Sequence, residues 1–258
     1  MHFVDVEALN FRNAPRATPE TKFGTLFLCH PVEIVEADSG DGFCRVRTRF
    51  DGAQTEGFVS RALLRESAGE RREALIAQAI LQWHRFERGL GKETVDPFFR
   101  HVGEMWRAIG IDLDGKDNDQ PWSAAAISFM VRHAGKGYED FRFAAAHARY
   151  IHHSIKKREA DAASPFWGFR LHEHRPRLGD MVCRWRERPI DFETARRRDD
   201  YKSHCDIVIK VDSAKNVVLA LGGNVRNSVS ITRYALGPGD FLADQGGVFA
   251  VLANRADA

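Results

Sequence analysis

Residues 121–135, with the sequence PWSAAAISFMVRHAG, decide the fold. They predict a helix rich in small residues, because proline is favoured near a helix start and glycine just after a helix end. The first turn of such a helix leaves backbone N–H groups unpaired and carries the positive end of the helix dipole. An oxyanion formed beside Ser123 would therefore be stabilised.

The spacing of apolar residues differs between the parts of the chain before and after residue 67. Residues 1–66 contain short runs of β-branched and aromatic residues separated by turn residues, which predicts a small all-β domain. From residue 67, apolar residues recur at three- and four-residue spacing and predict helices over about 67–89, 96–109 and 141–158. Strands are predicted at 181–185, 205–211 and 217–221, so residues 67–258 form an α+β domain with a helical lead-in at 67–110.

The composition of the chain limits the classes of binding partner and the cellular locations that we expect. Lys and Arg total 38 against 36 for Asp and Glu, so a net charge of +2 gives no reason to expect nucleic-acid binding. No run of 18 apolar residues predicts a membrane span, and no signal peptide is evident. We expect a protein that is cytoplasmic as made, or one exported by a non-classical route as a secreted effector or lysin.

The four cysteines are scattered, without a C-x-x-C pair. This spacing favours reduced, mostly buried thiols over zinc ligands or a disulfide framework, and neither a metal nor a cofactor is predicted. Cys205 alternates with His204 along a predicted strand, so we expect it to point to the opposite face as a small core residue.

Three further features accompany Ser123. His204 precedes the strand at 205–211, and Asp206 lies two residues on, on the same strand face. The turn Gly222-Gly223-Asn224 follows the next strand. A nucleophile, a base and two candidate orienting groups are thus present, although Asn224 after two glycines is also an ordinary turn residue.

The first 66 residues resemble a known domain family. Leu9-Asn10-Phe11-Arg12-Asn13-Ala14-Pro15, Gly24-Thr25-Leu26 and Glu56-Gly57-Phe58-Val59 are similar to motifs of bacterial SH3-like domains, which prefer tryptophan at the position of Phe58. The resemblance implies a small SH3-like β-barrel that holds cell-wall material or a protein partner. A barrel that serves only as a packing module is the alternative.

The second domain resembles the CHAP and NlpC-type cell-wall amidases, whose papain-like core has P-W-C-A-A-F at the helix and H-V-G at the strand. The stretch from Leu221 to Tyr234 is similar to a G-G-N segment of one CHAP-like branch. Residues 121–125, 146–151, 177–180 and 203–208 resemble the bacterial family called domain of unknown function 2272. These resemblances imply a papain-like α+β fold with helices packed on an antiparallel sheet.

The same resemblance implies site roles. Ser123 would be the nucleophile, His204 the general base and Asn224 the orienting group, with Asp206 as a rival for that last role. The amidases have cysteine where this chain has Ser123, and a hydroxyl is much harder to ionise than a thiol. Asp206, where the amidases have glycine, could compensate by fixing and stabilising the imidazole.

Two functions follow from this comparison. The first is a hydrolase that cleaves an amide or ester of cell-wall (peptidoglycan) peptide, or a related acyl substrate, through an acyl-enzyme on Ser123. The second is a catalytically inactive pseudoenzyme that binds cell wall or protein, in which Ser123 merely caps its helix. Trp122, His147 and Tyr150 are predicted to contact the substrate, with an ordinary helix histidine as the alternative for His147.

Overall fold

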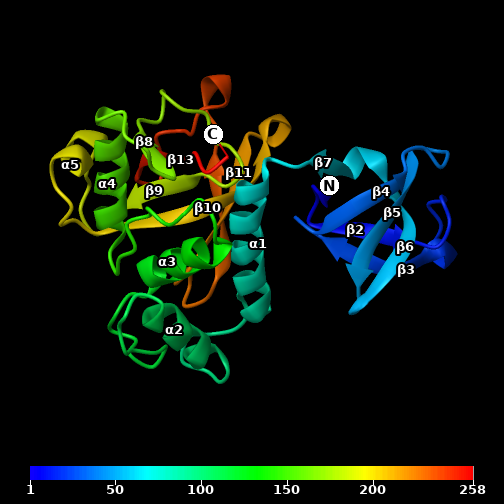
Figure 1. The fold of residues 1–258 in the computed structure, drawn as a ribbon, viewed down its shortest axis with the longest axis horizontal. Coiled ribbons are helices and arrows are strands. Elements are labelled where there is room, and N and C mark those ends of the chain that lie inside the picture. Colours follow the sequence, from blue (N-terminus) through cyan, green and yellow to red (C-terminus); the bar gives the residue numbers. More distant parts are fainter. Residues whose placement is uncertain (258) are drawn as a thin grey trace. The chain divides into compact units, whose positions relative to one another are not determined.

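The computed structural model describes residues 1–257 and has a mixed α+β fold (Figure 1). The chain divides into two compact units, Met1–Ala68 and Gly69–Ala258. Each unit contains one antiparallel sheet, and the α-helices of the described residues all belong to the second unit. The α+β class predicted from the sequence is therefore confirmed.

The first unit is a seven-stranded sheet with the order β3-β2-β6-β5-β4-β1-β7. Alternating side chains, including Phe11, Val46 and Val59, form its buried core. Within residues 1–68 the strand pairing leaves β3 and β7 at the two edges, so hydrogen bonds do not close the sheet into the barrel that the SH3-like resemblance implied. The strands are β1 (His2–Val4), β2 (Ala8–Arg12), β3 (Lys22–Phe27), β4 (Pro31–Glu36), β5 (Phe43–Phe50), β6 (Ala53–Ser60) and β7 (Leu64–Glu66).

The second unit is built on a six-stranded sheet with the order β12-β11-β10-β9-β13-β8. Its central strands are buried on both faces, as their continuous apolar runs require. In the register of β9 and β10, His204 lies opposite Arg184 and Cys205 opposite Cys183. The strands are β8 (Phe166–Phe169), β9 (Met181–Trp185), β10 (Ser203–Asp212), β11 (Val217–Gly222), β12 (Ser230–Ala235) and β13 (Val248–Asn254).

Helix α3 is the centre of this unit. Its residues from Ser123 to Val131 are all buried, and it packs against α1, α2, β10 and β11. The small side chains of Ala124–Ala126 allow this close approach, and the helix ends at Gly135, whose φ of +81° suits glycine. The helices are α1 (Glu70–Arg85), α2 (Phe98–Arg107), α3 (Ser123–Ala134), α4 (His147–Glu159) and α5 (Phe192–Arg197).

Helix α4 begins later than the sequence predicted, at His147 instead of near residue 141. The segment before it is tied to α3, because the Ser128 hydroxyl donates to the carbonyl oxygen of Ala144 and accepts from its N–H. These bonds hold the segment in a non-helical conformation. His147 thereby becomes the first helical residue instead of an interior one.

Within residues 1–257, no helix combines the length and the apolar character needed to cross a membrane. In the same residues, no three His, Cys, Asp or Glu side chains gather into a group that could hold a metal ion.

Candidate functional site

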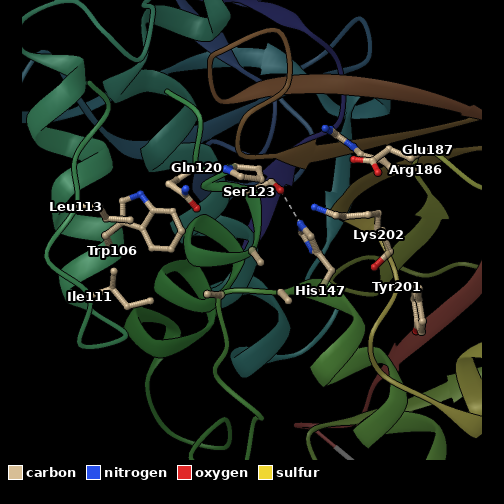
Figure 2. A pocket seen from close by; sticks show the side chains of 15 residues that line it. Trp106, Ile111, Leu113, Gln120, Ser123, His147, Arg186, Glu187, Tyr201 and Lys202 are labelled. Carbon is tan, nitrogen blue, oxygen red and sulfur yellow. Dashed lines mark hydrogen bonds between the residues drawn. The ribbon is translucent and has the colours of Figure 1, made fainter. Parts of the chain in front are cut away.

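Ser123 and His147 meet where two helices begin. Ser123 is the first residue of α3 and His147 the first residue of α4, and the distance from Ser123 Oγ to His147 Nε2 is 2.7 Å (Figure 2). Both residues are 4% exposed. The first intrahelical bond of α3 runs from Ala126 N–H to the Trp122 carbonyl, so the N–H groups of residues 123–125 have no partner within the helix.

A cavity of about 380 Å³ lies beside this pair. Figure 2 shows that its two sides differ in chemistry, with Ser123 and His147 between them. One side carries the apolar side chains of Trp106, Ile111 and Leu113, and the other carries Arg186, Glu187 and Lys202. The cavity is therefore suited to a ligand with one apolar and one polar end.

The partners of His147 determine which ring nitrogen carries its proton. Its Nδ1 accepts a hydrogen bond from the backbone N–H of Cys205, at 3.2 Å, and also contacts the Tyr150 hydroxyl. A backbone N–H can only donate, so Nδ1 is the unprotonated nitrogen. Nε2 then carries the proton and donates it to Ser123 Oγ, which leaves the hydroxyl proton of Ser123 free to be donated to a ligand.

The environment also keeps His147 neutral. Burial lowers its pKa well below the usual histidine value, and the nearby positive charges of Arg186 and Arg184 lower it further. The ring is therefore an uncharged hydrogen-bond donor to Ser123 near neutral pH.

His204 lies close to this pair but is engaged elsewhere. Its ring centroid is 5.1 Å from that of His147, its Nε2 is 2.7 Å from Asp206 Oδ1, and its Nδ1 is 3.2 Å from the Arg186 guanidinium. Arginine can only donate, so His204 accepts at Nδ1 and donates from Nε2 to Asp206. The histidine bonded to Ser123 is thus His147, while His204 connects Asp206 to Arg186.

Asp206 is fully buried at the end of this chain of hydrogen bonds. Burial by itself would raise its pKa, but the interaction with His204 and the hydrogen bonds from His204 and Tyr234 outweigh burial and lower the pKa below its ordinary value. Gly222 lies against the same pair, since a Cβ there would be 1.7 Å from Asp206 Oδ1 and 3.0 Å from His204 Nε2.

The remaining predicted site residues lie apart from the cavity. Asn224 has a φ of +54° in the turn after β11, and among residues 1–257 no hydrogen bond joins it to His204. Trp122 is 1% exposed and stacks on Phe86, and its indole N–H donates to Glu93. Tyr150 is buried and reaches the site only through His147.

Several cavity residues escaped the sequence analysis, among them the two cationic ones. Arg186 and Lys202 lie side by side where β9 and β10 meet the cavity. The backbone N–H of Arg186 donates to the backbone carbonyl of Lys202 at 2.9 Å. They are 16 positions apart and belong to no motif, so only the register of β9 and β10 brings them together. A predicted pairing of these two strands is the one signal that could have found them.

Residues 89–256 match the model of a family described as "Uncharacterized protein conserved in bacteria (DUF2272)". The match covers the serine–histidine pair and the cavity walls. No curated protein is similar enough to the chain to match it.

Proposed function

The chain belongs to the DUF2272 family, and we propose that its second unit is a catalytically inactive relative of the papain-like cell-wall amidases. In this proposal it binds an acyl or peptide ligand, such as cell-wall peptide, beside Ser123 without cleaving it. The observation that carries the proposal is the hydrogen bond from the Cys205 N–H to His147 Nδ1, from which we infer that the ring proton is on Nε2 and that Ser123 accepts a hydrogen bond from it.

A serine nucleophile needs a base whose unprotonated nitrogen faces its hydroxyl. His147 presents a protonated Nε2 instead. Moving this proton to Nδ1 would set it against the N–H of Cys205 and leave that buried donor unsatisfied, at a cost of about 1–3 kcal/mol. His204 offers no substitute, since both of its ring nitrogens are already engaged.

Binding, by contrast, uses the groups as they stand. The Ser123 hydroxyl proton and the free N–H groups at the start of α3 are all hydrogen-bond donors at one end of the cavity. They are fixed by buried neighbours, so a ligand acceptor would find them already oriented.

Element order supports the papain-like part of the proposal. The helix bearing Ser123 comes first, the strand bearing His204 follows, and the Gly222-Gly223-Asn224 turn ends the next strand of the antiparallel sheet. For the first unit we propose an SH3-like module with a partner-binding role. The cluster of Phe11, Phe23 and Phe50, in which Phe23 is 41% exposed, supports that role.

A serine hydrolase acting on cell-wall amides or esters is the second candidate. The 2.7 Å contact between Ser123 Oγ and His147 Nε2 at a helix N-terminus favours it, because this is the spacing of an activated nucleophile. This candidate requires the Nδ1-protonated form of His147, so the two functions differ in a single proton position.

Labelling with a fluorophosphonate probe separates these two candidates. We expect the wild type to label no more strongly than Ser123→Ala, because the serine is not activated. Ser228→Ala, which removes another buried serine hydroxyl that has no hydrogen-bond partner among the described residues, is the matched control. We also expect the wild type to sediment with purified cell-wall fragments and to leave them intact.

If the probe labels the wild type and Ser228→Ala but not Ser123→Ala, the hydrolase replaces the proposal. Failure to sediment with wall fragments would refute binding to that material.

A further inference from the structure

Arg186 is a cation with no carboxylate in direct contact, since the nearby Asp206 lies on the far side of the His204 ring. Its side chain is half-buried in the cavity wall and donates a hydrogen bond to the unprotonated Nδ1 of His204. Among the residues that the structure describes, it forms no ion pair with a carboxylate. Burial and the neighbouring Arg184 lower its pKa, and the more distant Asp206 offsets them only in part, so the charged form of Arg186 is incompletely compensated. Buried charges in proteins are normally paired, and an anion entering the cavity would supply the partner.

The charged residues around the cavity indicate whether this anion carries one negative charge or two. Arg186 and Lys202 are its cationic lining residues and Glu187 is its acidic one, while His147 is neutral. Asp206 is separated from Arg186 by the ring of His204. One net positive charge therefore faces the cavity, which matches a monoanion better than a dianion.

The opposite side of the cavity indicates what carries the charge. Trp106, Ile111 and Leu113 form an apolar wall across from Arg186 and Lys202 (Figure 2). Burying apolar area against such a wall favours binding. A small inorganic anion could not use this wall.

We propose that the cavity binds a monocarboxylate attached to an apolar acyl or peptidyl chain. The carboxylate lies between Arg186 and Lys202, with the Ser123 hydroxyl as a further donor, and the chain lies against Trp106 and Ile111. This inference rests on the proposed binding function and names the group that the site recognises. A planar guanidinium is suited to a carboxylate because it can donate two parallel hydrogen bonds.

The test is a titration of the full chain, followed by calorimetry, with N-acetyl-alanyl-alanine, its C-terminal amide, hexanoate and inorganic phosphate. We expect the wild type to bind the dipeptide acid or hexanoate at least about tenfold more tightly than the amide or phosphate, since a charged hydrogen bond is lost or mismatched. Whichever acid binds more tightly identifies the chain as peptidyl or acyl.

Variants locate the carboxylate. We expect Arg186→Gln and Lys202→Gln each to weaken binding of the better acid by about tenfold. Arg188→Gln, which changes an exposed arginine two residues away, should leave it unchanged. Lys202 is exposed, so its variant keeps the test decisive even if Arg186→Gln disturbs the fold.

Three results would overturn the carboxylate inference and leave the binding function standing. These are equal affinity for the acid and the amide, tighter binding of phosphate than of either acid, and an unchanged affinity for the acid in Lys202→Gln. If none of the four probes binds and wall fragments also fail to sediment with the protein, both the inference and the proposed function are overturned.

Discussion

His147 is held by three neighbours, of which the Cys205 N–H favours one arrangement of protons on its ring. The Cys205 N–H and the Tyr150 hydroxyl approach one nitrogen, and Ser123 Oγ approaches the other. The ring is buried and its pKa lies well below the usual value because of that burial. In the binding role proposed above, this histidine orients the serine hydroxyl and does not take its proton.

This burial predicts a dependence of folding stability on pH. The unfolded chain binds a proton on His147 below about pH 6.5, whereas the folded chain, with its lowered pKa, does not. The free energy of unfolding should therefore fall as the pH drops below about 6.5, down to the folded pKa. Urea unfolding between about pH 7 and pH 5 measures this slope.

The variant His147→Gln should show a shallower slope over the same range, because it removes this one titrating group. His133→Gln, at an exposed histidine, is the control and should keep the wild-type slope. Identical slopes in the wild type and in His147→Gln would show that the ring is not buried in its neutral form.

At the scale of elements, the ends of β10 and β11 hold the Arg186–His204–Asp206 chain in place. We expect Gly222→Ala to destabilise the second unit by about 1–3 kcal/mol or more, because its Cβ would overlap Asp206. Gly237→Ala is the matched control, since the nearest atom to its Cβ would be 3.7 Å away. A thermal unfolding midpoint that is equal in both variants would contradict the close packing of Gly222.

Local sequence pattern predicted the elements better than their contacts. The helix over 121–135 is confirmed as α3, because its proline, its glycine and its apolar residues all act within one segment. The late start of α4 was missed because it depends on Ser128, which lies 16 positions away from Ala144.

In the site, too, local features could be predicted and contacts between distant residues could not. Ser123 could be placed at a helix start from local signals alone. Its hydrogen bond to His147 could not be predicted, because it depends on where α4 begins, which the Ser128–Ala144 bonds determine, and on the Cys205 N–H that points at His147. The cation pair of Arg186 and Lys202 depends on the register of β9 and β10.

At the scale of the whole molecule, the change from alternating to helical periodicity near residue 67 lies close to the division between the two compact units. The order of helices and strands gave the α+β class. Closure of the first sheet could not be predicted, since it depends on whether its edge strands β3 and β7 pair with each other. Activity depends on a still finer detail, which is the tautomer of one buried ring.

The most direct test of the account is a long-range ¹H–¹⁵N correlation spectrum of the histidine rings in the full chain near neutral pH, with His147 assigned by its absence in His147→Gln. We predict a neutral ring with the proton on Nε2 and an unprotonated Nδ1, as the Cys205 N–H requires. A proton on Nδ1, with Nε2 free to accept from Ser123, would contradict the binding function and support a serine hydrolase.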